Sequence, residues 1–533
     1  MRWATTWVWT NTISSAWDWP ERGRLRPRGP QAPIELNSWG RAGRVDEKRK
    51  LSRQAPPSLI RRLSTVVGSE NCLSSPEELF TYGCDGLTLD AHEPSVVILP
   101  RTTEEVRRAV EICLEFEWPF VPRGAGTGLS GGAVPLDGAV VICCSRMQEI
   151  LEVDAENRIA VVQPGVINAE LSRAVAHLGL FYAPDPSSQQ ACTIGGNVAE
   201  NSGGPHTLKY GTTTNHVLAL ELVLPSASVL RLGSPTGFAA GYDLVGAVVG
   251  SEGTFGIVTE VTVRLVPLPE AVETVLAIFD DVPSACRLVG GIIRSGMCPA
   301  ALEVVDQRTV RAVEASTYAA GLPLDAGAIL IIELDGAECE MPGQLARIRE
   351  LADHEGVREM RIARDAKERV LFWRARKGAF GAMGRLAPDL YVHDAVVPRA
   401  RLPEVLEEIC AIGDRHRITL SNVFHAGDGN LHPNISFDRR DADELARVMA
   451  AGREMLELCV RVGGVLTGEH GVGTEKREYM GLLFGAADLA AMETLREVFD
   501  PDRICNPGKL IPTTRACVES NPRARGYDRV PIA

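Results

Sequence analysis

Short apolar runs alternate with amphipathic stretches from about residue 95 onward. The run 95–100 (SVVILP) predicts a buried strand, and 102–116 predicts a helix because Val106, Val110 and Leu114 fall on one stripe. Further strands are expected at 119–122, 139–144, 158–162, 217–224 and 257–265, with a helix at 168–178. This mixed order of elements predicts an α+β domain.

The pattern changes near residue 270. Up to about 463, strands such as 276–279, 328–333 and 419–424 alternate with helical patterns, which predicts a second α+β domain. The turn-rich segment 500–512 (DPDRICNPGKLIP) is expected to return to the first domain. These changes predict an extension 1–55, a first domain 56–269 with an N-terminal arm, a second domain 270–462, a C-terminal segment 463–512 and a tail 513–533.

The first 55 residues differ in composition from the rest of the chain. They contain six of the eight tryptophans, and eleven Arg and Lys against five Asp and Glu, without a helical or alternating apolar period. We expect a disordered or wrongly assigned extension. Two interpretations stay open, a leader or an overextended start of translation, since the uninterrupted apolar region of a secretory signal is missing.

Length, charge and cysteine spacing narrow the classes of function. A chain of 533 residues predicts two or three domains. A net charge of -13 argues against nucleic acid as a partner, because phosphate binding needs a basic surface. The 13 cysteines never form the Cys-x-x-Cys spacing of zinc or iron–sulfur sites, and no run of about 18 apolar residues occurs. We therefore expect a soluble, cytoplasmic protein without a transmembrane segment.

Three glycine-dense loops indicate one extended ligand. The first, 122–132 (PRGAGTGLSGG), exposes backbone N–H groups that suit a pyrophosphate. It contains a formal G-x-G-x-x-G, but a strand rather than a helix is expected to follow, which disfavours a nicotinamide site. Alone, this loop is also compatible with a flexible surface loop. Similar loops at 184–204 and 250–256 favour a ligand packed closely along the backbone.

The segment 424–433 (FHAGDGNLHP) contains two histidines around a turn. If Asp428 and Gly429 form the centre of a two-residue hairpin turn, His425 faces His432 as a cross-strand pair. Two such nitrogens share a cation when a carboxylate completes the site, and Glu469 in GEHG is the candidate. The alternative is a purely structural histidine pair.

Six motifs in order resemble one flavoprotein family: PRGAGTGLSGG, DPSSQQACTIGGNVAENSGGPHTLKYG, GSEGTFGIVTE, FHAGDGNLHP, GEHGVGTEK and DPDRICNPGK. Over about 56–512 the chain is similar to the FAD-linked oxidases of the vanillyl-alcohol oxidase, or PCMH-type, fold, in the branch that oxidises D-lactate and glycolate. The resemblance implies an α+β fold with a two-subdomain FAD-binding domain, an α+β substrate (cap) domain, and a C-terminal segment that returns to the FAD-binding domain.

The resemblance also implies which residues bind FAD. Because the first loop lacks the histidine that often carries covalent flavin in relatives, the FAD is expected to be non-covalent. The implied FAD-binding residues are Pro122, Arg123, Gly124, Ala125, Gly126, Thr127, Gly128, Asp185, Ser188, Gly195, Gly196, Asn197, Ser202, Gly203, Glu252, Gly253, Ile257 and Asn506.

The implied reaction is the oxidation of a small 2-hydroxy acid, glycolate or D-lactate. A divalent metal, usually zinc, lowers the pKa of the substrate hydroxyl so that a neighbouring histidine acts as base, and an arginine binds the substrate carboxylate. The carboxylate anchor is expected in FWRARK (372–377), for which a basic helix face is the alternative. By resemblance the metal ligands are His425, His432 and Glu469, the base is His470, and the substrate contacts are Arg376, Lys377 and Asn434.

Other functions stay open at this point. Longer substrates such as D-2-hydroxyglutarate form one alternative, a flavin-binding accessory subunit with an incomplete active site forms a second, and a sugar-phosphate binding protein without flavin forms a third. Without an iron–sulfur cysteine pattern the chain needs an external electron acceptor. The resemblance implies an iron–sulfur subunit and a second flavin subunit of a glycolate oxidase complex, with any contact to the inner membrane made through these partners.

Overall fold

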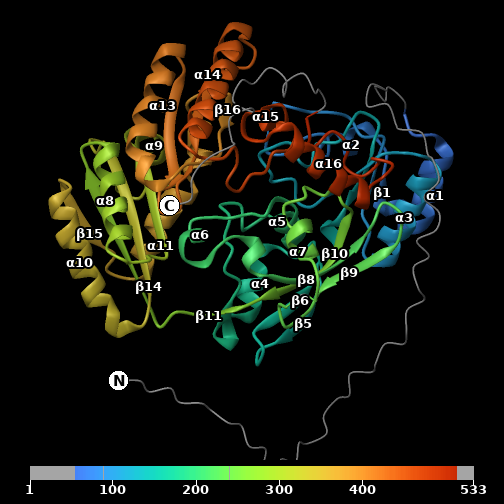
Figure 1. The fold of residues 1–533 in the computed structure, drawn as a ribbon, viewed down its shortest axis with the longest axis horizontal. Coiled ribbons are helices and arrows are strands. Elements are labelled where there is room, and N and C mark those ends of the chain that lie inside the picture. Colours follow the sequence, from blue (N-terminus) through green and yellow to red (C-terminus); the bar gives the residue numbers. More distant parts are fainter. Residues whose placement is uncertain (1–53, 88, 239, 513–533) are drawn as a thin grey trace, which may run out of the picture. The chain divides into compact units, whose positions relative to one another are not determined.

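The computed structural model describes residues 54–87, 89–238 and 240–512 (Figure 1). The predictions for the extension before residue 54 and for the tail from residue 513 lie outside the described residues. Ser75 and Glu78 form a capping box at the start of α2 (Pro76–Phe80).

A small sheet carries the first glycine loop. Its strands follow the order β1 (Cys72–Leu73), β2 (Val96–Ile98), β4 (Val140–Cys143) and β3 (Phe120–Arg123), and the last three are parallel. The amphipathic helices α1 (Pro57–Val67) and α3 (Thr103–Glu115) pack on it, since Leu59, Val106 and Val110 share a core with the strands. The first glycine loop begins where β3 ends.

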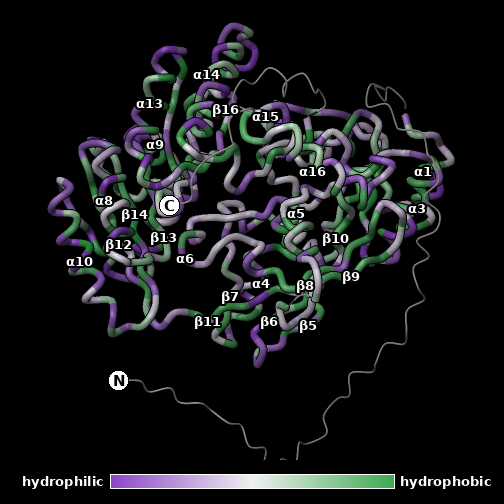
Figure 2. The backbone as a smooth tube through the Cα atoms, viewed as in Figure 1, coloured by the Kyte–Doolittle hydropathy of each residue, from purple (hydrophilic) through white to green (hydrophobic). Residues whose placement is uncertain are grey.

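A second, antiparallel sheet carries the other two glycine loops. Its order is β5 (Ile150–Asp154), β6 (Ile159–Val162), β10 (Ile257–Arg264), β8 (Val217–Val223) and β9 (Val229–Gly233). Packed against it are α4 (Asn168–Val175), α5 (Ile194–Glu200) and α7 (Leu244–Val248). Figure 2 shows hydrophobic stretches along β8 and β10, the central strands. Nearby lie β7 (Leu180–Phe181), β11 (Val266–Pro267) and α6 (Thr207–Tyr210).

The strands of the second half form a separate nine-stranded sheet. The main path is β15 (Glu359–Ile362), β12 (Ala271–Phe279), β14 (Ala328–Gly336), β13 (Ala301–Asp306), β18 (Thr419–His425), β19 (Asn430–Leu431) and β17 (Ala395–Val396). Off this path, β20 (Pro433–Phe437) pairs with β18 and with β16 (Asp389–Val392). All of these pairs are antiparallel.

Helices cover both faces of this sheet, so its strands are apolar on both sides. Along β14, Leu330 and Ile332 face one helical layer, and Ile329 and Ile331 face the other. The first layer contains α8 (Val282–Arg294), α10 (Met341–His354), α13 (Leu402–His416) and α14 (Ala442–Arg461). The second contains α9 (Gln307–Glu314), α11 (Ala366–Lys377) and α12 (Ala379–Met383). Because both faces of the sheet are mostly apolar, polar side chains on the face covered by α9, α11 and α12 indicate a functional site.

The C-terminal segment returns to the first sheet, as predicted. After α15 (Met480–Leu483) and α16 (Ala486–Phe499), Phe120 N–H donates to Ile504 O (2.9 Å) and Asn506 N–H donates to Phe120 O (2.8 Å). Short 3-10 turns lie at Ser69–Asn71, Cys144–Arg146, Ala176–Leu178, Thr213–Asn215, Glu338–Glu340, Arg399–Arg401 and Arg477–Tyr479. No helix in the described ranges has the length and apolar character needed to cross a membrane.

Candidate active site

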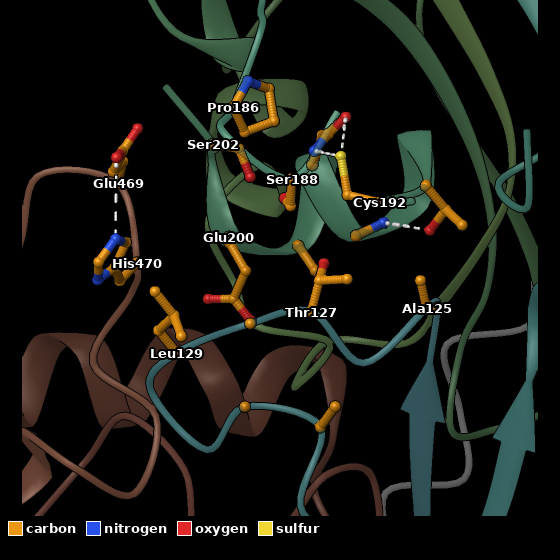
Figure 3. A pocket seen from close by; sticks show the side chains of 18 of the residues that line it. Ala125, Thr127, Leu129, Pro186, Ser188, Cys192, Glu200, Ser202, Glu469 and His470 are labelled. Carbon is orange, nitrogen blue, oxygen red and sulfur yellow. Dashed lines mark hydrogen bonds and ion pairs between the residues drawn. The ribbon is translucent and has the colours of Figure 1, made fainter. Parts of the chain in front are cut away.

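One large cavity of about 390 Å³ joins the glycine loops to the nine-stranded sheet (Figure 3). One side of it is formed by the glycine loops, and the other by α11, the β18–β20 region and the loop before α15. Most of the predicted site residues line it: Pro122, Arg123, Gly124, Ala125, Gly126, Thr127, Gly128, Ser188, Gly195, Gly196, Asn197, Ser202, Glu252, Gly253, Ile257, Arg376, Lys377, His425, His432, Asn434, Glu469 and His470.

The glycines of this cavity are required by close backbone approach. A Cβ at Gly124 would overlap Oγ1 of Thr193, which caps α5 by accepting from Gly196 N–H (3.3 Å). A Cβ at Gly195 would lie 2.6 Å from Cβ of Pro164. The loops thus present main chain, with few side chains, to a ligand, which fits a long cofactor with a pyrophosphate.

Three predicted FAD-binding residues do not line the cavity. Asn506 is buried and donates from Nδ2 to Gly132 O (3.0 Å) and Glu252 O (2.6 Å), so it ties the first and third glycine loops together. Gly203 leaves space beside Glu469, because a Cβ there would lie 3.0 Å from Oε2 of Glu469. The third, Asp185, belongs to an ionic network described below.

The predicted hairpin register is wrong. His425 pairs with Asn430, and four residues rather than two form the turn between them. His432 follows Asn430 by two positions, so it still lies on the same face as His425, as a diagonal neighbour. The two rings are edge to face, with centroids 5.1 Å apart and planes at 88°. The two histidines therefore lie on the same face of the sheet, as predicted, although they are diagonal neighbours and not a directly opposed pair.

His425, His432 and Glu469 meet at one point in the cavity. Nε2 of each histidine lies 3.3 Å from Oε1 of Glu469, and one ligand atom from each residue lies within 4.8 Å of the others. Burial alone would raise the pKa of Glu469, but His425 and His432 hold it well below its usual range. Two imidazoles and one ionised carboxylate with open positions fit a divalent cation such as zinc.

Glu303 of β13 supports this cluster from behind. It is fully buried; its Oε1 lies 2.7 Å from Nδ1 of His425, and its Oε2 lies 2.6 Å from Nη2 of Arg376. Burial alone would lower the pKa of His425, but Glu303 and Glu469 raise it well above its usual value. A carboxylate on Nδ1 fixes the imidazole so that Nε2 faces the proposed cation. The buried Nε of Arg376 has no hydrogen-bond partner among the described residues, so the guanidinium keeps an unused donor beside the cavity.

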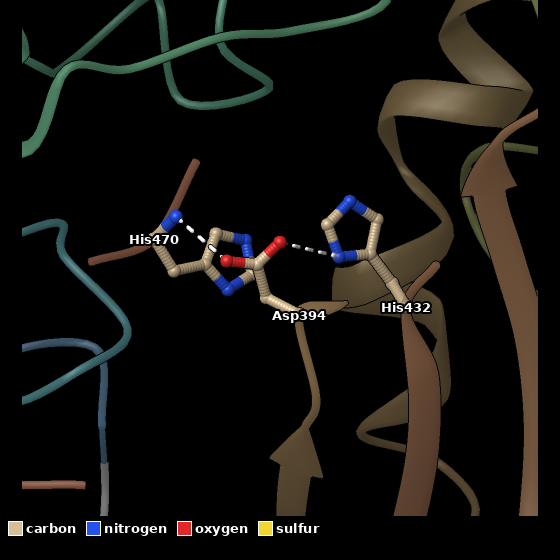
Figure 4. Close-up of side chains that lie close together, drawn as sticks. All are labelled: Asp394, His432 and His470. Carbon is tan, nitrogen blue, oxygen red and sulfur yellow. Dashed lines mark hydrogen bonds and ion pairs between the residues drawn. The ribbon is translucent and has the colours of Figure 1, made fainter. Parts of the chain in front are cut away.

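Asp394, between β16 and β17, organises the loop that carries Glu469 and His470. Its Oδ2 accepts from Thr467 Oγ1 (2.6 Å) and from three backbone N–H groups at 2.9–3.2 Å, those of Gly468, Glu469 and His470. Its Oδ1 accepts from Nδ2 of Asn430 (2.6 Å). Asp394, His432 and His470 also lie close enough to suggest a metal triad (Figure 4). Because both Asp394 oxygens are already used, we interpret Asp394 as a support rather than a ligand.

His470 stacks on His432, with ring centroids 4.9 Å apart and planes at 12°. Burial lowers the pKa of His470 to about 4, although Asp394 opposes this shift. Its Nδ1 is buried without a hydrogen-bond partner in the described part of the chain. His470 is therefore a neutral imidazole at neutral pH, able to accept a proton in the cavity.

An ionic network joins the second glycine loop to the nine-stranded sheet. Asp185 Oδ2 lies 2.9 Å from Nδ1 of His206 and 3.1 Å from Nζ of Lys377, and Nε2 of His206 lies 2.9 Å from Oε1 of Glu333. Burial alone would lower the pKa of His206, but Asp185 and Glu333 raise it to about 10. The network holds Lys377 at the cavity wall, and it assigns Asp185 an anchoring role.

Sequence reasoning missed Glu303, Glu333 and Asp394. Two of them lie inside apolar strands, in ALEVVD and AILIIELDG, and the third lies between two short apolar strands, in YVHDAVV. An acidic residue in a strand that is buried on both faces needs a buried partner. An acidic residue within an apolar strand was therefore the feature of the sequence that could have identified these positions, although it does not identify the partner.

Comparisons with known proteins identify the family of the chain. The model described as FAD binding domain matches residues 94–233, and the model described as FAD linked oxidases, C-terminal domain, matches 268–510. The glycolate oxidase subunit GlcD of Escherichia coli (strain K12) is 45% identical over 462 residues, 87% of this chain and 92% of GlcD. The mitochondrial D-lactate dehydrogenase (cytochrome) of Arabidopsis thaliana is 30% identical over 465 residues, 86% of this chain and 81% of that protein.

Among solved structures, p-cresol methylhydroxylase with substrate bound has a TM-score of 0.71 and 18% identity, and covers 85% of this chain and 96% of its own. This likeness confirms the predicted PCMH-type α+β fold. With both domains matched in order and 45% identity to GlcD over most of its length, the chain belongs to the family of FAD-linked oxidases that includes the glycolate oxidase subunit GlcD.

Proposed function

We propose that this flavoenzyme oxidises a small 2-hydroxy acid, glycolate or D-lactate, to the 2-oxo acid. The relatives named for glycolate and D-lactate support the substrate class. The observation that carries the proposal is the meeting of His425, His432 and Glu469 in the same cavity as the glycine loops, beside Arg376. In domain terms, residues 56–269 bind the cofactor, 270–462 bind the substrate, and 463–512 complete the site.

FAD held non-covalently along the three glycine loops supplies the acceptor for the hydride that leaves the substrate α carbon. A divalent cation, zinc in our proposal, held by His425, His432 and Glu469 would supply a Lewis acid that lowers the pKa of the substrate hydroxyl. The chain's own part is to fix the substrate and to remove the hydroxyl proton. Neutral His470, stacked on His432, accepts that proton at its ring nitrogen.

Arg376 binds the substrate carboxylate with the N–H groups that Glu303 leaves free. Lys377 adds positive charge at the cavity wall, fixed by Asp185. Asn434 is buried at the cavity wall and donates from Nδ2 to His432 O (2.7 Å), so its side chain positions the His432 segment. Together these residues select a short acid with a hydroxyl on the next carbon.

In this proposal the reduced flavin passes its electrons to a separate protein. GlcD is named as a subunit, which supports a complex with an iron–sulfur subunit and a second flavin subunit. In this arrangement the chain is cytoplasmic and reaches the inner membrane through these partners. The isolated protein should reduce artificial dyes, react slowly with oxygen and leave NAD and NADP unreduced. Rapid reoxidation by oxygen with stoichiometric hydrogen peroxide would show a true oxidase.

Anaerobic mixing tests the proposed reaction. The FAD-loaded protein is mixed with glycolate, D-lactate, L-lactate or D-2-hydroxyglutarate while flavin absorbance is followed. We expect bleaching by glycolate or D-lactate, and loss of bleaching after chelation of the metal. Bleaching by D-2-hydroxyglutarate alone would assign the longer substrate, and a flavin that no 2-hydroxy acid reduces would indicate an accessory subunit.

A further inference from the structure

One carboxyl group in the cavity has no part in the chemistry above. Glu200, the last residue of α5, lines the cavity, and Figure 3 shows its side chain pointing toward the first glycine loop. Its Oε2 is buried and has no hydrogen-bond partner among residues 54–87, 89–238 and 240–512. A buried polar oxygen of this kind usually has a partner, so its position indicates a bound group in the cavity.

Two glycines make room for the Glu200 carboxyl group. A Cβ at Gly132 of the first loop would lie 2.5 Å from Oε1, and a Cβ at Gly471 (φ +87°) would overlap Oε2. The carboxyl group is therefore held between the first loop and the C-terminal segment. Because both positions are glycines, neither supplies a side-chain donor to the Glu200 carboxyl group.

The charged groups around Glu200 favour its protonated form. Glu252 lies close to Glu200, since a Cβ at Gly471 would approach both carboxyl groups. The two oxygens of Glu252 accept from the N–H groups of Val472 (2.6 Å) and Gly473 (2.7 Å). Burial raises the pKa of Glu252 too, but these two bonds oppose that rise. Oε2 of Glu200 accepts no such bond, so we expect Glu200 to be the protonated member of the pair. Burial, with Glu252 and Asp85 nearby, raises the pKa of Glu200 well above its usual value.

Two lysines oppose this shift only in part. Lys476 Nζ lies 3.7 Å from Oδ2 of Asp394 and 3.5 Å from Oε2 of Glu475. Lys509 Nζ donates to Val134 O (2.7 Å). Both ammonium groups are thus held by other partners, and neither forms an ion pair with Glu200 in the described part of the chain.

We propose that Glu200 is kept as a neutral carboxylic acid and donates its O–H to the flavin cofactor in this cavity. A carboxylic acid in such surroundings is a hydrogen-bond donor at neutral pH, whereas an ionised carboxylate would only accept. The proposal rests on flavin binding and not on the identity of the substrate. Ionisation of Glu200 at high pH then removes the donor and places a negative charge against the cofactor.

Apoprotein reconstitution tests the contact. FAD dissociation constants are measured near pH 7 for the wild type, Glu200→Gln, Glu200→Ala and the control Glu170→Gln, an exposed acid on α4. Gln stays neutral and can donate, so we expect a change within about twofold, whereas Ala should weaken FAD binding about fivefold or more. Equal affinities for Ala and wild type, or equal losses for Gln and Ala, would overturn the proposal.

Infrared difference spectroscopy of the holoenzyme tests the proton without needing a stable Ala variant. Dithionite, which needs no substrate, reduces the flavin, and the reduced-minus-oxidised spectrum is compared between wild type and Glu200→Gln. A protonated-carboxyl band that shifts on reduction and disappears in Glu200→Gln is expected. Absence of that band in the wild type, or its persistence in the variant, would refute a neutral Glu200. A flavin that dithionite reduces and 2-hydroxy acids do not would refute the proposed function separately.

Discussion

The two walls of the cavity differ in the groups that they present to it: one presents mainly backbone, and the other presents charged side chains. The wall from the first two sheets presents mainly backbone, with glycines at 124, 126, 128, 195 and 196; a Cβ at 124, 126 or 195 would overlap neighbouring protein atoms. The wall from the nine-stranded sheet presents charged side chains, among them Arg376 and the cluster of His425, His432 and Glu469, each held by a partner. The structure of the first wall depends on glycines, which have no side chain, and the structure of the second depends on ion pairs.

This difference decides how each wall responds to substitution. A side chain added to the backbone wall should act locally, by displacing the loop segments packed against it. A residue removed from the charged wall leaves its partners buried without their counter-charges, which costs more than the interaction itself. Substitutions in the charged wall should therefore cost more stability, and they should also disturb the residues paired with the one replaced.

His432→Ala gives the largest expected effect. The variant loses one proposed metal ligand and the ring on which His470 stacks, so the rate of flavin reduction by substrate should fall about 10³-fold or more. Bound metal should be lost in step, while FAD stays bound by the other wall. Stopped-flow absorbance and elemental analysis measure both. The control His177→Ala, at an exposed position, should match the wild type; a His432→Ala protein with full rate and full metal content would contradict the site.

Glu303→Gln should lower the free energy of unfolding by about 3 kcal/mol, because Arg376 keeps its charge in a buried site after the counter-charge is gone. Metal affinity should also fall about 10- to 100-fold, since Glu303 orients His425. The control is Glu359→Gln on the exposed edge strand β15, whose free energy of unfolding should match that of the wild type. Equal stability of the two variants would remove Glu303 from the supporting role.

The two walls also differ in how far the sequence predicted them. Glycine-rich loops were recognisable because both their residues and their ligand contacts are local in the chain, and the strands around them lie within about two residues of their predicted positions. The charged wall was recognised only where two members sit close in sequence, as in the segment 424–433.

Partners from distant strands were not predictable. Glu303 meets His425 only because β13 pairs with β18, and Asp394 reaches the 467–470 loop across the same sheet. Pairing between strands more than 100 residues apart leaves no local pattern. The hairpin register failed for a related reason: Asp-Gly favours a two-residue turn, but pairing with both β13 and β20 fixes β18 in another register.

Gly124→Ala tests the backbone wall. Its Cβ would overlap Oγ1 of Thr193 and displace the first loop or the α5 cap, so FAD affinity should fall about 10-fold while metal content stays unchanged. Fluorescence titration of the apoprotein with FAD measures the affinity. The matched control is Gly343→Ala, on helix α10 with open space around it, which should bind FAD normally. Loss of metal together with FAD would show that the walls are not independent.

His206→Gln tests the junction between the walls through its pH dependence. Asp185 and Glu333 raise the pKa of His206 to about 10 in the folded protein, against about 6.5 when unfolded. The folded state therefore keeps a proton that the unfolded state releases. The resulting stabilisation is complete below about pH 6.5, and it is lost as the pH rises through about 10.

Urea unfolding at about pH 7 and pH 9 measures this contribution. The free energy of unfolding of the wild type should fall by about 2.5 kcal/mol more over this interval than that of His206→Gln, which has no proton to release. The exposed control His177→Gln should keep the wild-type slope. Identical slopes in wild type and His206→Gln would mean that Asp185 and Glu333 do not hold a charged histidine. Lys377 would then be the remaining charged link between Asp185 and the substrate side of the cavity.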